Sequence, residues 1–224
     1  GASFANATAA NALDIDEGRL VLTGHPAAIV VPPALAAAEI TDASVREFLE
    51  AVIVGYEVGT RQSIAIREFT GLHTGTGSWG PVGAAAAIAR LEGIDRRTLQ
   101  HALSIAEYHA PRSPIMRNAV RPGMTKDGIG WGGFVGAVSV ELAERGFTGS
   151  GTVFDEPEIS DIPAFGTEYI IDDGYYKPYP ACQWTIAGID AAITLREEHG
   201  IDPGEIGEIR VDTFEQAAAL ATRR

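Results

Sequence analysis

The chain contains two long segments built largely from small residues, and these constrain its fold more than any other feature. One is GPVGAAAAIARLEG, residues 80–93, and the other begins GIGWGGFVGAV at residue 128. As a helix, the first segment carries small residues on several faces, which lets the backbones of neighbouring helices approach closely. The sequence therefore predicts a closely packed body of helices.

Apolar periodicity predicts further helices around these two segments. In the longest, apolar residues recur at the i, i+3 and i+4 spacing of an amphipathic helix, and we expect Thr41 and Asp42 to cap its start. Pro32 and Pro33 are expected to kink the preceding helix or to start its main part. Residues 110–127 are expected to be irregular. The expected helices cover residues 1–13, 26–39, 41–70, 80–93, 98–108 and 128–145.

The character of the sequence changes near residue 150. Prolines become frequent, residues 168–171 and 206–214 read as strands, and residues 185–199 read as a helix. We therefore predict a mainly α fold, with an all-helical domain over residues 1–165 and the start of a smaller α+β domain over residues 166–224.

Composition excludes several classes of function. The formal net charge is −13 and no basic cluster is present, which argues against nucleic acid and anionic membranes as partners. No apolar run reaches the roughly twenty residues of a membrane span. Because residue 1 already stands in an expected helix, we expect no signal peptide. The single cysteine, Cys182, rules out an internal disulfide and fits a reducing, cytoplasmic setting. No Cys/His group has the spacing of zinc ligands, so we expect no metal.

Two carboxylates and an imidazole, Asp14, Asp16 and His25, lie between two apolar segments. Charged residues in such a place either cap helices and turns or line a pocket. In a pocket, acid–base groups beside apolar walls are candidate catalytic groups. On this segment alone, both interpretations stay open.

The loop HTGTGSWG, residues 73–80, precedes an expected helix. Its glycines would let the backbone approach a ligand, and a helix N-terminus favours an anion. A phosphate loop would need a Gly-Lys-Ser/Thr sequence, which is missing. The segment is either a tight connection between helices or a site, in which His73 would act as acid or base near pH 7 and Thr76 would contact the ligand.

Two cations, Arg121 and Lys126, stand in a loop before the second glycine-rich segment. A guanidinium and an ammonium group there suit a carboxylate substrate, although most loop lysines are simply solvated. The segment YYKPYPACQ, residues 175–183, adds Tyr179 and Cys182 ahead of a helix. A thiol near a helix N-terminus is expected to be somewhat activated, unless Cys182 is only a small buried residue.

Four segments together resemble the MmgE/PrpD family. They read LDIDEG followed by GHPAAIVVPPALAAAE, then HTGTGSWGPVGAAAAIARLEGID, then MTKDGIGWGGFVGAVSVELAERGFTG, then KPYPACQWTIAGIDAAITL. The segments occur in the family's order and at similar spacing, over essentially the whole chain.

The resemblance implies a helical domain followed by an α+β lid domain, with the active site between them, and a homodimer. It implies a lyase or isomerase that acts without cofactor on a small di- or tricarboxylate, as do 2-methylcitrate dehydratase, cis-aconitate decarboxylase and iminodisuccinate epimerase. Because family members are about twice this length, the resemblance also implies a partial chain.

The resemblance places four residues on active-site positions of the family. Asp14 and His25 would hold or protonate the substrate, while His73 and Lys126 would flank the reacting carbon. Further contacts with the substrate are expected from Arg121, Thr76, Tyr179 and Cys182.

The chain also departs from the family's pattern. Relatives often carry histidine, threonine and histidine at the positions of Asn11, Gly18 and Ile186, and they have Pro-Leu-His where this chain has Asp127-Gly128-Ile129. A missing imidazole removes an acid–base group that contributes about 10²–10⁴-fold to a rate. The departures predict a divergent substrate or, alternatively, a catalytically silent or fragmentary member that binds carboxylates or acts as an assembly scaffold.

Overall fold

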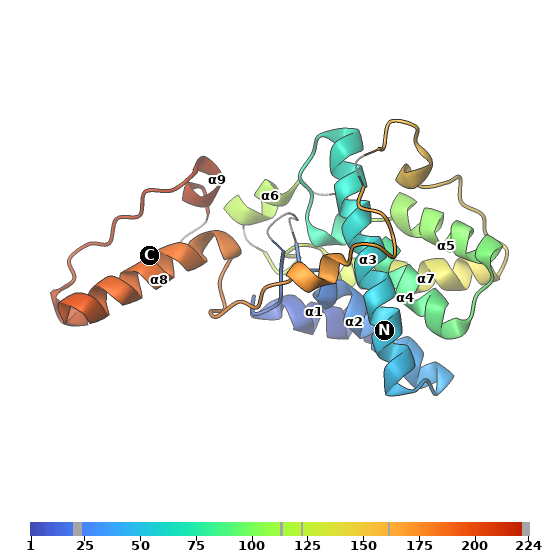
Figure 1. The fold of residues 1–224 in the computed structure, drawn as a ribbon, viewed down its shortest axis with the longest axis horizontal. Coiled ribbons are helices and arrows are strands. Elements are labelled where there is room, and N and C mark those ends of the chain that lie inside the picture. The colour runs from blue at the N-terminus through green and yellow to red at the C-terminus, as the bar shows by residue number, and fades with distance from the viewer. Residues whose placement is uncertain (20–23, 113, 122, 161, 221–224) are drawn as a thin grey trace.

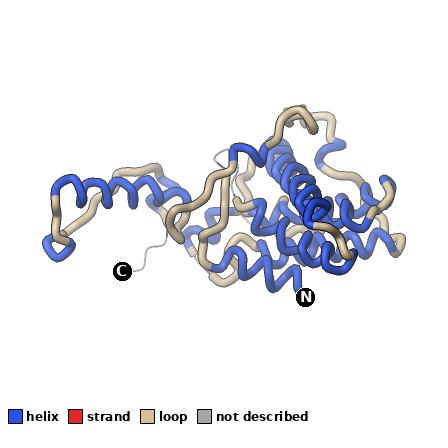
Figure 2. The backbone as a smooth tube through the Cα atoms, turned by 60° about the horizontal axis from the view of Figure 1, so that its bottom comes forward, coloured by secondary structure: helices blue, strands red, loops and turns tan. Residues whose placement is uncertain are grey.

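The computed structural model describes residues 1–19, 24–112, 114–121, 123–160 and 162–220 (Figure 1). Over these residues the chain is mainly helical, as predicted, and Figure 2 shows helices joined by loops without a strand. The helices are α1 (Ala2–Ala12), α2 (Pro26–Thr41), α3 (Val45–Thr70), α4 (Gly80–Glu92), α5 (Arg96–Tyr108), α6 (Ile115–Val120), α7 (Ile129–Glu144), α8 (Gln183–His199) and α9 (Glu215–Ala218). Short 3₁₀ turns are η1 (Thr76–Ser78), η2 (Val153–Asp155), η3 (Ile170–Asp173) and η4 (Pro203–Glu205). Among these described helices, none combines the length and apolar character that crossing a membrane requires.

Helix α4 lies at the centre of the helical body, in contact with α2, α3, α5 and α7. Its residues from Gly80 to Ala89 are all buried, so this part of the helix has no face toward solvent. The approach to α3 is close, because Gly55 of α3 faces Gly83 of α4. The prediction of close helix packing is therefore confirmed, since the small residues of α4 allow four other helices to pack against it.

Replacing Gly55 with alanine is expected to destabilise the fold by about 1–3 kcal/mol, because a packed core accommodates a new methyl group only by shifting its surroundings. A Cβ at Gly55 would lie 2.7 Å from the Gly83 carbonyl oxygen and 2.8 Å from the Ala87 Cβ. Gly188→Ala on α8 is the control, because a Cβ there meets nothing closer than 3.4 Å and alanine favours helix. Urea unfolding of both variants checks the prediction, which equal destabilisation would contradict.

The start of α3 differs from the prediction. Thr41 is the last residue of α2, and Asp42 is its C-cap, with a left-handed backbone (φ 52°). The N-cap of α3 is Ser44, whose hydroxyl accepts from the Glu47 N–H while the Glu47 carboxylate accepts from the Ser44 N–H. The expected cap was therefore wrong, because the reciprocal Ser-x-x-Glu pair satisfies two helix-end N–H groups at once.

Two other helix boundaries were also refined by the structure. Pro32 and Pro33 lie inside α2, which begins at Pro26, so these prolines do not start the helix. Helix α5 begins at Arg96, two residues before its predicted start at Thr98, and its N-cap is Asp95, whose carboxylate accepts from the Thr98 N–H.

The strand expected over residues 168–171 is not formed, and η3 overlaps its end. The N–H groups of Ile170 and Ile171 donate instead to the carboxylate of Glu57 on α3. A strand prediction assumes that a neighbouring strand accepts these hydrogen bonds, and here a side chain of α3 accepts them.

The strand expected over residues 206–214 is likewise not formed, and this segment is irregular. Its apolar Ile209 and Val211 are exposed. A strand needs a neighbour that completes its hydrogen-bond ladder, and in the described part of the chain none lies alongside. Helix α8 has no buried residue, and both views show it extending away from the helical body (Figures 1 and 2). The chain then runs back along α8, so that Phe214, just before α9, lies against Trp184 near the start of α8, with ring centroids 5.5 Å apart. The division at residues 165 and 166 stays a prediction, and residues 221–224 lie outside the described chain.

Candidate active site

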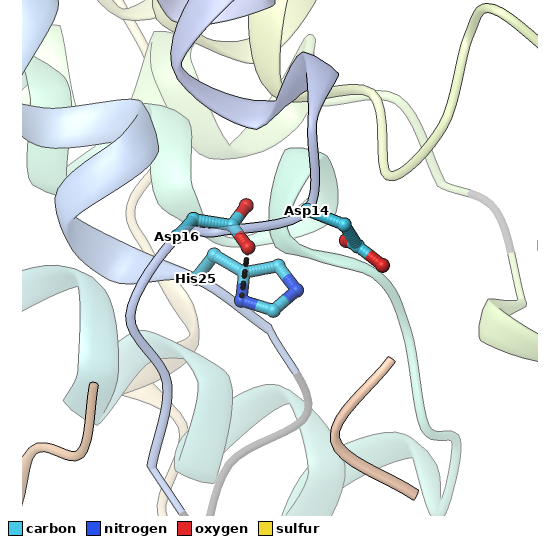
Figure 3. Close-up of side chains that lie close together, drawn as sticks. All are labelled: Asp14, Asp16 and His25. Carbon is cyan, nitrogen blue, oxygen red and sulfur yellow. Dashed lines mark ion pairs between the residues drawn. The ribbon is translucent and has the colours of Figure 1, made fainter. Parts of the chain in front are cut away.

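Charged side chains from distant parts of the sequence meet where the chain leaves α1 and enters α2. Figure 3 shows three of them: Asp14 and Asp16 follow α1, and His25 precedes α2 with its ring against the Asp16 carboxylate. The loop between α6 and α7 and the segment before α8 supply others. We refer to this group as the acid–base cluster, and its members are Asp14, Asp16, Glu17, His25, Lys126, Asp127 and Lys177.

The His25 ring is held in one orientation. Its Nδ1 lies 2.7 Å from the main-chain oxygen of Glu17 and 3.5 Å from Asp16 Oδ1. Because a carbonyl oxygen can only accept, Nδ1 carries the hydrogen, and Nε2 of the neutral ring keeps its electron pair. Nε2 faces Asp127 Oδ2 at 3.8 Å. The imidazole is therefore oriented to accept a proton through Nε2.

The loop before α4 holds Asp127 opposite this ring. Thr76 Oγ1 accepts from the main-chain N–H of His25 at 3.0 Å and donates toward Asp127 Oδ2 at 3.4 Å. Gly77 N donates to the Asp127 main-chain oxygen at 2.8 Å, and a Cβ on Gly77 would lie 2.7 Å from that oxygen. Asn118 Nδ2 donates to Asp127 Oδ1 at 3.3 Å. The loop, for which the sequence left open a tight connection or an anion site, thus holds the chain's own aspartate.

The chain has two lysines, Lys126 and Lys177, and both reach the cluster. Lys177 has a fully buried side chain, and its Nζ lies 2.9 Å from Asp16 Oδ1 and 3.4 Å from Asp14 Oδ1. Lys126 Nζ lies 3.4 Å from the same Asp14 oxygen and also donates to the Asn11 carbonyl, with 28% of its side chain exposed. Lys177 therefore neutralises the buried carboxylate of Asp16 and also pairs with the partly exposed one of Asp14, while Lys126 is accessible to a ligand from solvent.

The pKa values of three carboxyl groups in the cluster are shifted, one downward and two upward. Burial opposes ionisation of Asp14, but the two ammonium groups beside it outweigh burial and hold the pKa of this carboxyl below its usual value. Burial raises the pKa of both Glu17 and Asp127. One carboxyl group with a lowered pKa thus lies near two with raised pKa values, and titratable groups shifted apart in this way are typical of sites that transfer protons.

Replacing Asp127 with asparagine is expected to remove part of the pH dependence of stability. Because the native pKa of Asp127 lies above the unfolded value, the native state binds more protons between the two values, and its stability falls as pH rises through that window. The difference in melting temperature between Asp127→Asn and the natural chain should therefore become more favourable to the variant as the pH rises above about 4, the usual pKa of an aspartate. Calorimetry at several pH values measures this difference, and a constant difference would contradict the prediction.

Two residues of the cluster have an unusual backbone. Asp14 (φ 60°) and Lys126 (φ 40°) adopt the left-handed region, which residues other than glycine rarely occupy. Such conformations concentrate at functional sites, where surrounding contacts hold a side chain in place against the strain. The backbone therefore supports the cluster as the functional site.

A comparison with known protein families decides where this chain belongs. The family model of the MmgE/PrpD N-terminal domain matches residues 1–160. The chain belongs to the MmgE/PrpD family. A search of curated proteins found no match to it. The matched residues contain every member of the acid–base cluster except Lys177, and they place the chain in a family of dehydratase-like lyases.

The structure brings together some of the residues to which the MmgE/PrpD resemblance points. Four of them meet in or beside the cluster, namely Asp14, His25, Lys126 and Thr76. His73 is exposed at the start of the loop before α4, where its carbonyl accepts from the Ile115 N–H at 3.2 Å. Arg121 is exposed at the C-terminal end of α6. These two residues are not members of the cluster, and their roles stay predictions.

Tyr179 and Cys182 lie at the start of α8. The Tyr179 hydroxyl donates to Asp190 Oδ1 on α8 at 2.8 Å. Cys182 is the N-cap of α8, and burial, together with the nearby negative charge of Asp14, raises the pKa of its thiol. Of the two interpretations that the sequence left open for Cys182, this favours a partly buried small residue over an activated thiol, because desolvation of the thiolate outweighs the favourable helix end.

The sequence patterns did not single out Lys177, Glu17 or Asp127 as functional residues. Lys177 carried one usable signal, since the chain's two lysines both stand in MmgE/PrpD-like segments. Asp127 had been noted only as a departure from the family's pattern. Another departure, Asn11, donates through Nδ2 to Asp16 Oδ2 at 2.5 Å, so it orients a carboxylate of the cluster.

Three residues of the cluster have the spacing of metal ligands. Asp14, Asp16 and His25 each offer one ligand atom, and these atoms lie within 4.8 Å of one another. The buried ammonium group of Lys177, however, contacts both carboxylates. A cation would have to displace it, so this donor set fits an internal ion pair better than a metal ion.

Proposed function

We propose that this chain is an MmgE/PrpD-type lyase or isomerase that acts on a small di- or tricarboxylate without a metal or organic cofactor, in the manner of 2-methylcitrate dehydratase. The observation that carries the proposal is the His25 imidazole, held through Nδ1 by Glu17, with Nε2 facing Asp127 at 3.8 Å. The partly exposed ammonium group of Lys126 lies in the same cluster and suits a carboxylate ligand.

In the first step, His25 Nε2 takes the proton from the carbon next to a substrate carboxylate. The electron pair of that C–H bond moves toward the carboxylate and gives an enediolate-like intermediate. Lys126 lowers the cost of this charge, because a fixed cation stabilises charge that develops during the reaction. Arg121 would hold a second carboxylate of the substrate from the α6–α7 loop.

In the second step, the proton taken up by the base leaves again. In a dehydration, the imidazolium of His25 protonates the departing hydroxyl group on the adjacent carbon, and the electron pair of the intermediate forms the double bond. In an epimerisation, an acid on the other side of the substrate returns a proton to the opposite face of the carbon, and His73 would serve, while the His25 imidazolium releases its proton to water. These two reactions share their first step. A decarboxylation would differ there, because the C–C bond to a carboxylate breaks instead of the C–H bond, carbon dioxide leaves, and an acid protonates the carbanion that remains.

The reaction is tested with citrate, methylcitrate, aconitate and iminodisuccinate, each incubated with the chain in deuterated water and followed by NMR. The proposal expects a new product from at least one of them, or exchange of the α-hydrogen for deuterium. Exchange without net conversion would identify an epimerase. Binding of a carboxylate with neither exchange nor product would contradict the proposal and favour the silent, scaffold-like member.

We also propose a homodimer in a reducing, cytoplasmic setting. The MmgE/PrpD resemblance implies the dimer, and the single cysteine fits the reducing setting. Sedimentation velocity at several protein concentrations measures the oligomeric state, and a monomer at every concentration would contradict the dimer.

A further inference from the structure

Two buried charged residues of α3 lie outside the acid–base cluster. Glu57 and Arg61 form an ion pair one helical turn apart, with the Arg61 side chain fully buried and that of Glu57 8% exposed. Buried ion pairs contribute little net stability compared with apolar residues of similar size. A contribution to stability alone therefore does not account for this pair in the core.

Arg61 binds the main chain of the segment that follows the matched family domain. Its guanidinium group donates to three carbonyl oxygens, those of Pro163, Ala164 and Glu168, at 2.8, 3.1 and 2.8 Å. The Phe165 ring covers the same guanidinium group, with its centroid 4.5 Å from Cζ. The planar group with its fixed donors thus fixes the path of this segment at several points.

Glu57 binds the next part of the same segment. Its Oε2 accepts from the Ile170 N–H at 3.0 Å, and its Oε1 accepts from the Ile171 N–H at 2.9 Å. Both residues belong to the short turn η3, and the rest of the segment from residue 163 to residue 177 forms no helix or strand. The ion pair on α3 therefore supplies the main-chain hydrogen bonds that secondary structure supplies elsewhere.

The segment fixed in this way leads directly to the cluster. Gly18, two residues after Asp16, exchanges main-chain hydrogen bonds of 3.2 and 3.0 Å with Tyr175. Two residues later, Lys177 places its buried ammonium group on Asp14 and Asp16. Residues 163–177, which we call the connecting segment, are thus bound to α3 in their first part. Their last residue, Lys177, lies in the acid–base cluster.

We propose that Arg61 and Glu57 are positioning residues for the candidate active site, which fix the connecting segment so that Lys177 stays between Asp14 and Asp16. The consequence for catalysis rests on the proposed function. The geometric part does not, because the placement of Lys177 can be measured without a substrate.

Amine-reactive labelling followed by mass spectrometry measures the placement, since Lys126 and Lys177 are the chain's two lysines. In the natural chain we expect Lys126 to react and Lys177 to resist, because the side chain of Lys177 is fully buried. In Arg61→Gln, labelling of Lys177 relative to Lys126 should rise by about tenfold or more, because lost charge-assisted hydrogen bonds ease local opening of the segment.

Two further variants make the result specific. Glu57→Gln is a milder change, which should raise Lys177 labelling and speed hydrogen exchange at Ile170 and Ile171. If Arg61→Gln does not fold, the labelling of Glu57→Gln tests the positioning role instead. Thr60→Val is the control, because Thr60 is fully buried on α3 and its hydroxyl bonds within that helix, to the Tyr56 carbonyl at 2.8 Å. Labelling at the natural rate in the folded Arg61 and Glu57 variants, or an equal rise in Thr60→Val, would overturn the proposal.

Turnover measured on the same samples separates this proposal from the proposed function. If both hold, Arg61→Gln lowers kcat along with the change in labelling, and Thr60→Val changes neither. A natural chain without activity that still shows the expected labelling pattern would refute the proposed function and support the positioning role.

Discussion

Replacing His25 with glutamine is expected to lower turnover of the carboxylate substrate by about 10²–10⁴-fold, the usual contribution of a general acid–base group. Glutamine is similar in length and keeps a donor for the Glu17 carbonyl, which His25 Nδ1 contacts at 2.7 Å. Its amide cannot take up a proton, however, so the base opposite Asp127 is lost. Steady-state kinetics measure the loss, and circular dichroism shows whether the helices persist.

Two matched variants make this result interpretable. His199→Gln changes an exposed histidine at the end of α8 and is expected to leave turnover unchanged. His73→Gln tests the role that the MmgE/PrpD resemblance implies for His73, and a comparable loss there would add it to the catalytic groups. Turnover of His25→Gln equal to that of the natural chain would contradict the role of His25 as base.

Replacing Lys177 with methionine is expected to lower the free energy of unfolding by about 3–5 kcal/mol near neutral pH, the usual cost of breaking a buried ion pair from one side. Lys177 Nζ contacts Asp16 Oδ1 at 2.9 Å, and the Asp16 side chain is only 2% exposed. Without the ammonium group, this carboxylate is buried beside Asp14 with no cation of its own. Chemical denaturation at neutral pH measures the loss.

Lys126→Met is the matched control for this prediction. It removes the same charge from the neighbourhood of Asp14 but leaves Asp16 paired with Lys177, and 28% of the Lys126 side chain is exposed. Its effect on stability should therefore be clearly smaller. The penalty of Lys177→Met should also shrink at low pH, where the carboxylates become protonated. Equal losses in the two variants, or a penalty that does not change with pH, would contradict the account.

The helical body was predictable because its signals are local. The small-residue segment of α4 and the periodicity of α3 depend on neighbours along the chain. Helix α4 formed where it was expected, and α3 formed with only its start displaced, from residue 41 to Val45. The strand predictions failed because a strand depends on a partner that the local pattern does not identify. At residues 168–171 that partner is the Glu57 carboxylate on α3.

The candidate site was predictable only in part, for a similar reason. Asp14, His25 and Lys126 stand in segments whose order resembles the MmgE/PrpD family, and the structure brings these three together. The contact between Lys177 and Asp16 joins residues 161 positions apart, and no spacing rule relates them. The raised pKa of Asp127 results from burial, which becomes known only when the helices have packed.

The central claim is that His25 acts as a base on the carbon next to a substrate carboxylate. The most direct measurement is the rate at which that α-hydrogen exchanges for deuterium, followed by proton NMR in deuterated water for the natural chain and for His25→Gln. We predict exchange with at least one small di- or tricarboxylate in the natural chain, and a rate lower by about 10²-fold or more in the variant. Equal exchange rates in the two proteins, or no exchange of any such carboxylate by the natural chain, would contradict the account.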